Sequence, residues 1–207
     1  MPRKKVETIS QFIFGFDIDG VLTNDDDGIS SIWLEEASKY FGEPILKHAY
    51  YIEDAFNKTR AEVQRFFDAR IDSIFNNVPA REHAAETLRG LANQGCIVHL
   101  ITARDEQHRE ITENWLRKHN MPYHSLTMSP TNKSYSKGER CQELGVEFFV
   151  DDKVENAEDV ASKGIYTVLY HASHNVGRQT SLPLVKSWLE VQKHIDFFCG
   201  QRLRQVP

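Results

Sequence analysis

Four short apolar runs, each ending in a polar turn, constrain the fold of this chain more than any other feature. They occupy residues 12–16, 96–101, 147–150 and 165–169 and are rich in β-branched and aromatic side chains. Runs of this length and composition are typical of strands that are buried on both faces of a parallel sheet. A weaker run of the same kind spans residues 124–128. The strands of a parallel sheet are joined by crossover connections.

Helical patterns occupy most of these connections. Residues 81–93, 106–119 and 137–144 space their apolar side chains at helical intervals, and residues 183–198 form one more amphipathic segment. Alternating strands and helices predict βαβ crossovers, and hence an α/β fold with a doubly wound, Rossmann-like and mostly parallel sheet. We expect the strand at residues 12–16 to lie in the interior of this sheet.

The stretch from residue 25 to residue 79 interrupts the alternation and contains no clear strand pattern. Thr59, with Glu62 three residues later, matches the capping box that begins a helix. We therefore expect a catalytic core formed by residues 1–24 and 80–207, with a helical cap inserted at residues 25–79. The helices expected in the cap are residues 31–40, 52–57 and 61–76.

Charge and composition exclude several classes of protein. A net charge of −5 provides no basic surface for duplex nucleic acid, although a small anion can still bind beside a metal ion. No run reaches the roughly 20 apolar residues that span a bilayer, and no apolar stretch of a signal peptide follows the basic start. The three cysteines form no CxxC pair, which favours free thiols over disulfides or zinc. We expect a soluble, cytoplasmic protein with no membrane partner, and a homo-oligomer stays an open alternative.

Two carboxylates follow the first apolar run directly. Asp17 and Asp19 are separated by one residue and followed by Gly20, which permits a sharp turn. Their mutual repulsion would raise the pKa of one of them unless a cation intervenes. Mg²⁺ prefers oxygen ligands, so the pair favours a magnesium site. A solvated acidic turn or a helix cap is the alternative for this pair taken alone.

Polar side chains follow other predicted strands as well. Thr102 and Arg104 follow the second run, Asp151 and Asp152 follow the next-to-last, and Lys137 begins the helix before it. Ligands of open α/β sheets bind at the carboxyl ends of the strands, where these side chains should meet. Acids, a hydroxyl and a cation together suit phosphoryl transfer, in which charge on the transferred oxygens must be neutralised.

In their order, these residues resemble the four motifs of the haloacid dehalogenase superfamily. The resemblance extends from about residue 12 to about residue 169. It implies a core of the haloacid dehalogenase type that carries a small helical cap. The motifs are DIDGVLT at residues 17–23, Thr102 at the end of CIVHLIT, Lys137, and Asp151-Asp152 after EFFV.

The resemblance implies roles for the acidic residues. Asp17 would attack phosphorus and form an aspartyl-phosphate. Asp19 would protonate the leaving oxygen and then activate water. The carboxylates of Asp17 and Asp152 and the main-chain carbonyl of Asp19 would hold Mg²⁺. Asp151 would lie behind these ligands or complete the site through water.

The resemblance also implies that Thr102 and Lys137 hold the transferring phosphoryl group. Lys133 is the alternative lysine, but Lys137 heads the helical run that leads to the next strand. Arg104 departs from the simplest form of the second motif and would reach the phosphate or another part of the substrate. The acid at Asp19 favours a phosphatase over the superfamily members that cleave carbon–halogen bonds or transport ions.

Within the superfamily, the chain is similar to the 5'-nucleotidase group, which includes cytosolic deoxyribonucleotidases and bacterial relatives. The similarity rests on ITAR, ITENWLRKHNMPY and FFVDDKVENA. It implies a small phosphorylated substrate, a (deoxy)nucleoside monophosphate. The alternatives are a phosphatase of sugar phosphates or other small phosphorylated metabolites, and a non-catalytic module that binds phosphate or nucleotide.

Three further groups of residues suggest less specific interpretations. The acidic run at residues 25–27 is expected to be a solvated hinge into the cap rather than a metal site. His171 and His174 lie in a polar loop and are expected on the surface. The aromatic residues of the cap would either pack its own core or stack on a nucleobase, for which the two tyrosines are the better candidates: Tyr50, Tyr51, Phe56, Phe66 and Phe67.

Overall fold

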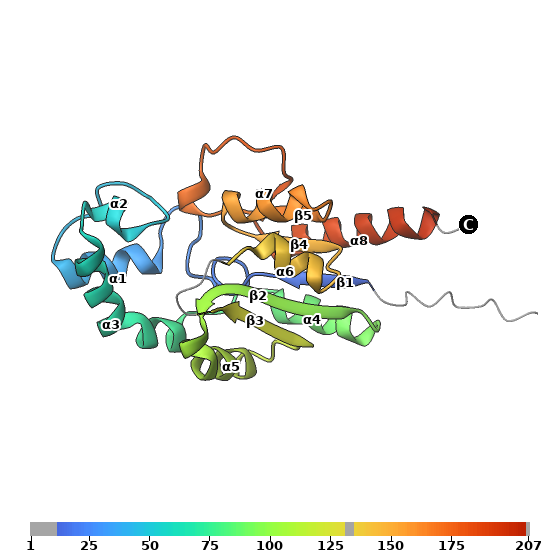
Figure 1. Cartoon of the computed structure of the whole chain (residues 1–207), viewed down its shortest axis with the longest axis horizontal. Coiled ribbons are helices and arrows are strands. Elements are labelled where there is room, and N and C mark those ends of the chain that lie inside the picture. The colour runs from blue at the N-terminus through green and yellow to red at the C-terminus, as the bar shows by residue number, and fades with distance from the viewer. Residues whose placement is uncertain (1–11, 131–134, 206–207) are drawn as a thin grey trace, which may run out of the picture.

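The computed structural model describes residues 12–130 and 135–205 of the chain. Within these residues six parallel strands form one sheet in the order β3-β2-β1-β4-β5-β6 (Figure 1). The predicted α/β fold is confirmed, and the first strand lies inside the sheet. The strands are β1 Ile13–Phe16, β2 Ile97–Asp105, β3 Ser125–Ser129, β4 Phe148–Asp151, β5 Tyr166–Tyr170 and β6 Leu184–Val185.

Side chains alternate between the two faces of the central strands, as the pleat of a sheet requires. Phe14 of β1 pairs in register with Val98 of β2 and Phe148 of β4, and all three belong to one apolar cluster. Gly15 points to the other face, where an added Cβ would lie 2.7 Å from the ring of Phe149. Both faces of the sheet are therefore buried, which explains the nearly continuous apolar runs in the sequence.

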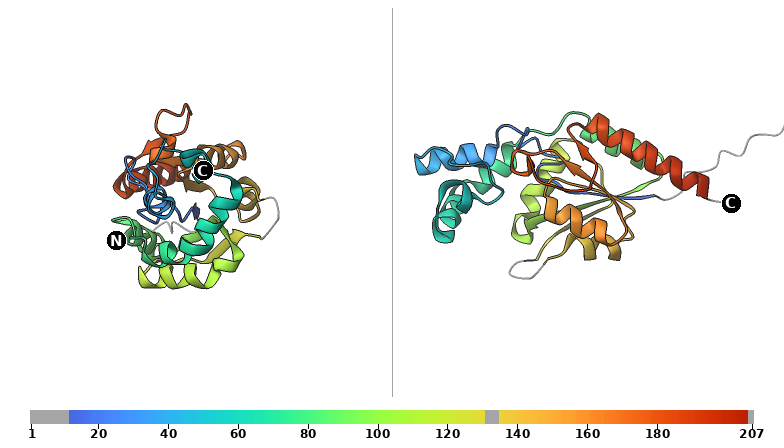
Figure 2. Two further views of the ribbon diagram at one scale, coloured as in Figure 1. Left: turned by 90° about the vertical axis from the view of Figure 1, so that its left-hand side faces the viewer. Right: turned by 90° about the horizontal axis from the view of Figure 1, so that it is seen from above.

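Helices cover the two faces of the sheet. The cluster that contains Phe14 includes residues of α4, α5 and α8, whereas the cluster around Phe149 includes residues of α6 and α7. Figure 2 shows α8 on one side of the sheet, with α6 and α7 on the other. The helices are α4 Ala84–Asn93, α5 Arg109–Lys118, α6 Lys137–Glu143, α7 Val154–Ser162 and α8 Trp188–Gln205.

The structure differs from the sequence prediction at two places. Helix α7 was not predicted, although Val154, Ala157 and Val160 place buried side chains at helical spacing. The predicted helix at residues 183–198 instead begins at Trp188, because residues 184–185 pair with β5 as the short strand β6. A two-residue strand is too short for its pattern to appear in the sequence.

A group of three helices lies beyond the carboxyl ends of the strands, at the opposite end of the molecule from the last turns of α8 (Figure 1). The predicted capping box is present at Thr59 and Glu62, where α3 begins. The segments that connect this group to the sheet pair with each other, since Asn24 N–H donates to Pro79 O at 2.7 Å. The boundaries of the cap stay a prediction. The helices are α1 Ile32–Phe41, α2 Ile52–Phe56 and α3 Arg60–Asn77.

The cap helices enclose an apolar cluster of their own. Phe56 and Phe66 are buried in it, so these two aromatic side chains serve packing, and the partly buried Phe67 packs against it. Tyr50 and Tyr51 are not part of this cluster, and both are exposed. The cysteine thiols are free, and no helix among the described residues combines the length and apolarity needed to cross a bilayer.

Candidate active site

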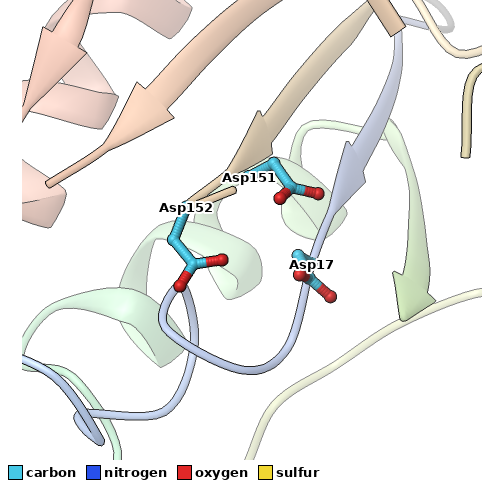
Figure 3. A group of neighbouring side chains, drawn as sticks. All are labelled: Asp17, Asp151 and Asp152. Atoms are coloured by element: carbon cyan, nitrogen blue, oxygen red, sulfur yellow. The ribbon is translucent and has the colours of Figure 1, made fainter. Parts of the chain in front are cut away.

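Neighbouring strand ends bring three carboxylates together. Phe16 of β1 and Val150 of β4 are in register, so Asp17 and Asp151 follow on adjacent strands, and the Asp17 N–H donates to Val150 O at 3.0 Å. Asp152 comes next in the chain. One oxygen from each of Asp17, Asp151 and Asp152 lies within 4.8 Å of the other two (Figure 3). This is the meeting point expected from the parallel sheet.

Lys137 bridges two of these carboxylates from the first turn of α6. Its Nζ lies 2.5 Å from Asp17 Oδ2 and 2.7 Å from Asp151 Oδ2. The Ser136 hydroxyl accepts from Glu139 N–H, so α6 starts directly before Lys137 and aims this side chain at the strand ends. The alternative, Lys133, lies outside the described residues.

The cluster carries more buried negative charge than Lys137 can balance. Burial raises the pKa of Asp17 to about 7, although the Lys137 ammonium opposes this rise. Burial and the neighbouring Asp151 and Asp17 carboxylates raise the pKa of Asp152 well above its ordinary value. Burial alone would lower the pKa of Lys137, but Asp151 and Asp17 outweigh it and raise that pKa. Surplus carboxylate charge on converging oxygens fits a hard divalent cation such as Mg²⁺.

The turn after β1 is shaped around Asp152. Gly20 has φ +71°, and an added Cβ there would lie 2.0 Å from Asp152 Oδ2. The buried Asp25 carboxylate holds the turn from the other side, accepting from Gly20 N–H at 2.7 Å and from the Thr23 hydroxyl at 2.6 Å. Asp25 also accepts from Trp33 Nε1 of α1 at 2.8 Å, which connects the turn after β1 to this helix.

Asp19 and Arg104 form a two-point ion pair. Arg104 Nε and Nη2 donate to the two carboxylate oxygens of Asp19 at 2.9 and 2.7 Å. The side chain of Arg104 is 1% exposed and contacts Asp19, and its predicted contact with the substrate stays a prediction. The Asp19 side chain is 31% exposed. The Asp19 carboxylate is therefore partly exposed beyond the carboxyl ends of the strands, and the buried Arg104 contacts it from the protein interior.

Thr102 lies at the end of the regular part of β2, next to β1. Its hydroxyl oxygen accepts from Arg104 N–H at 3.1 Å, which leaves the hydroxyl hydrogen available for another acceptor. The residue itself is buried, but it contributes to the wall of the cavity. Thr102 can thus donate to an anion that binds beside Asp17.

A cavity of about 860 Å³ separates these residues from the cap. Small-molecule sites commonly enclose about 300–1,000 Å³, so this volume suits a small substrate. Asp17, Asp19 and Asp152 form its floor, together with Thr102 and Arg104. The cap contributes an aromatic and acidic wall, which includes Trp33, Tyr50, Tyr51, Glu53, Phe67, Asp68, Asp72 and Phe75.

Two interpretations from the sequence are wrong. The acidic run is not a solvated hinge, because Asp25 and Asp26 are buried and Asp26 accepts from Ser173 N–H at 2.7 Å. His174 is not a surface residue, since its Nε2 lies 3.7 Å from Asp152 Oδ2 and its side chain is 12% exposed. Asp26 and Ser173 are 147 residues apart, so no local pattern in the sequence indicated the contact.

Comparisons with known proteins agree with this architecture. A family described as "5' nucleotidase, deoxy (Pyrimidine), cytosolic type C protein" matches residues 11–202. A Bacillus cereus protein named "Putative nucleotidase" is 29% identical over 181 residues, covering 86% of this chain and 95% of that protein. A nucleotidase of Clostridium acetobutylicum is 24% identical over 162 residues, covering 77% of this chain and 80% of its own.

A solved structure shows the same fold. The haloacid dehalogenase-like family hydrolase from Streptococcus pneumoniae superposes with a TM-score of 0.65 and 14% sequence identity. The match covers 89% of this chain and 98% of that one. The sheet and its helices therefore have the haloacid dehalogenase arrangement that the motifs predicted.

Proposed function

The chain belongs to the cytosolic type C 5'-nucleotidase family, and from this premise we propose that it hydrolyses (deoxy)nucleoside monophosphates through an aspartyl-phosphate on Asp17, with Mg²⁺. Membership makes it a phosphatase of the nucleotidase kind on a haloacid dehalogenase fold. One observation supports the proposed mechanism above all others: the Asp17, Asp151 and Asp152 carboxylates converge beside Lys137, and two of them, Asp17 and Asp152, line the cavity.

The charge of this cluster supports the proposal that Mg²⁺ is required. The carboxylates of Asp17 and Asp152, with the main-chain carbonyl of Asp19, would hold the ion, and Asp151 would complete the site directly or through water. Asp151 already accepts from Lys137 Nζ and from Lys153 N–H, which suits an orienting role. When bound, Mg²⁺ would neutralise charge on the phosphoryl oxygens.

The residues of this chain supply the remaining chemistry. A carboxylate oxygen of Asp17 attacks phosphorus as the bond to the ester oxygen breaks, and Asp19 gives that oxygen a proton. Asp19 then takes a proton from the water that attacks phosphorus, which frees inorganic phosphate and restores Asp17. The Thr102 hydroxyl and the Lys137 ammonium hold the phosphoryl oxygens during both steps.

The walls of the cavity support a nucleoside as the leaving group. We propose that residues 25–79 form a cap that excludes water and selects this group. Tyr50 and Tyr51 line the cavity without packing in the cap core, and both contact Lys153: its Nζ lies 3.9 Å from the Tyr50 ring centre and 3.0 Å from the Tyr51 hydroxyl. Aromatic faces in this position can stack on a base.

The charge of the same wall disfavours a leaving group that is itself an anion. Asp68 and Asp72 line the cavity, and the guanidinium of Arg104 is already paired with Asp19. A second phosphate or a carboxylate would meet negative charge here. Sugar phosphates and other small phosphorylated metabolites with uncharged leaving groups are the alternative substrate class.

A phosphate-release assay tests this proposal. The wild-type protein is incubated with ribo- and deoxyribonucleoside 5'-monophosphates, ribose 5-phosphate and 2-phosphoglycolate, each with Mg²⁺ or with EDTA. We expect release only with Mg²⁺, and kcat/KM for at least one nucleotide above that for the other two compounds by about tenfold, or ~1.4 kcal/mol. A preference for ribose 5-phosphate would move the substrate to the alternative class. Binding of nucleotide without release from any compound would make the protein a non-catalytic module.

A further inference from the structure

Arg104 is held in place independently of any substrate. The guanidinium carbon lies 3.8 Å from the ring centre of Phe75, so the group stacks on this face. Arg104 Nη1 also donates to the Thr112 hydroxyl of α5 at 3.2 Å. Together with the two bonds to Asp19, these contacts engage each of the three nitrogens of the guanidinium.

A buried arginine of this kind fixes the carboxylate that it binds. Taking a guanidinium out of water is unfavourable unless a carboxylate pairs with it closely, so Arg104 holds Asp19 tightly. Two parallel bonds also set the plane of the carboxylate, which a single bond from a lysine would not do. Asp19 itself lies on a turn after β1, where its side chain would otherwise rotate more freely.

Phe75 connects this pair to the cap. The residue is buried near the end of α3, and its ring meets Trp33 of α1 edge-on with centres 5.6 Å apart. Trp33 in turn donates to Asp25, which holds the turn after Asp19. Two cap helices thus contact the surroundings of Asp19, α3 through Phe75 and α1 through Trp33.

We propose that Arg104 is a positioning residue that orients the Asp19 carboxylate toward the leaving group and couples this orientation to the cap through Phe75. The proposal rests on the proposed role of Asp19 as proton donor to the leaving oxygen. The contacts of Arg104 favour positioning over a direct contact with the phosphate: it lines the cavity, but each nitrogen of its guanidinium already donates to Asp19 or to Thr112.

Dependence on the leaving group distinguishes these two roles. Phosphoryl transfer from p-nitrophenyl phosphate releases a stable phenolate that needs little protonation, whereas a nucleotide releases an alkoxide that must be protonated. The value of kcat/KM reports the steps up to this departure. Loss of Asp19 orientation should therefore lower kcat/KM for a nucleotide much more than for p-nitrophenyl phosphate.

The experiment measures kcat/KM of Arg104→Met for thymidine 5'-monophosphate and p-nitrophenyl phosphate. We expect a fall of about 100-fold for the nucleotide, the size of a general-acid contribution, and of less than about threefold for the aryl ester. Arg104→Lys, which keeps the charge without the two-point geometry, should recover part of the nucleotide activity. It also provides the test if the methionine variant does not fold.

Two further variants complete the design. Phe75→Leu should lower the nucleotide activity in the same direction, and its effect should not add to that of Arg104→Met, because both act on one pair. Arg109→Met is the matched control, since Arg109 lies five residues along and pairs with Glu106 and Glu113. This control should leave both activities within about twofold of wild type.

Equal losses of kcat/KM for both substrates in the Arg104 variants would overturn the proposal and would indicate a direct contact with the phosphoryl group. Additive effects of Phe75→Leu and Arg104→Met would overturn the coupling to the cap. Asp19→Asn separates this proposal from the proposed function. If Asp19→Asn loses nucleotide activity selectively and Arg104→Met does not, only the positioning role fails. If Asp19→Asn affects both substrates equally, the proton-donor role of Asp19 fails, and the positioning role with it.

Discussion

Mg²⁺ should stabilise this protein much more at pH 8 than at pH 5. Burial raises the pKa of Asp17 from 3.8 to about 7 in the metal-free fold, so the folded state binds a proton that the unfolded chain has released. A carboxyl group with a raised pKa contributes its full stability below about pH 4 and loses it as the pH rises toward 7. At pH 8 the cluster is charged and strained by repulsion, and a divalent cation relieves that repulsion.

The pKa shift sets the size of the effect. A rise from 3.8 to about 7 corresponds to about 4 kcal/mol lost by pH 8, at about 1.4 kcal/mol for each pKa unit. One kcal/mol moves the Tm of a protein of this length by about 2–4 °C. If Mg²⁺ recovers half of the loss, the Tm rises by about 4–8 °C at pH 8. At pH 5 the ion must displace a bound proton, and the rise should be below about 2 °C.

Thermal unfolding followed by circular dichroism, with saturating Mg²⁺ or with EDTA, measures these shifts. Asp152→Asn should lose most of the shift at pH 8, because a proposed ligand is gone. Asp196→Asn changes an exposed acid on α8, outside the three-carboxylate cluster, and should keep it. Equal shifts at the two pH values, or a full shift in Asp152→Asn, would refute the reasoning.

Other substitutions test individual contacts of the site. Lys137→Met leaves two buried carboxylates without their cation. It should lower the free energy of unfolding, measured in urea, by about 3–5 kcal/mol, and a decrease below about 1 kcal/mol would contradict the bridging role. Gly20→Ala places a Cβ against the Asp152 carboxylate. The affinity for Mg²⁺, measured by calorimetry, should fall by at least about tenfold, and an unchanged affinity would argue against this arrangement. Trp33→Phe removes a hydrogen-bond donor from the buried Asp25. It should lower the free energy of unfolding in urea by about 1–3 kcal/mol, and an unchanged value would show that this bond contributes nothing to stability.

The sequence predicted the elements whose signals are local. Buried parallel strands must be apolar along their whole length, so the runs that became β1, β2, β4 and β5 were visible, and β1 was correctly expected inside the sheet. The capping box at Thr59 depends on two residues three apart, and it was found for the same reason. Strand β6 was missed because two residues provide too short a pattern.

The convergence of Asp17, Asp151 and Asp152 was also predictable, because parallel strands end at one edge of the sheet. The partners of those residues were not. Arg104 and Asp19 are 85 residues apart, and their pairing depends on how β2 lies beside β1 and on the position of α3. The partner of a long side chain depends on how the helices and strands pack together. The strand pattern alone does not specify that packing.

The most direct test of the proposed mechanism is to trap the phosphoryl group on the protein. The wild type and Asp17→Asn are mixed with a nucleoside monophosphate and Mg²⁺, quenched in acid, digested and analysed by mass spectrometry. We expect the wild type to carry one phosphoryl group on the peptide that contains Asp17, and Asp17→Asn to carry none and to release no phosphate. Full phosphate release by Asp17→Asn, or a phosphoryl group on another residue, would contradict Asp17 as the nucleophile.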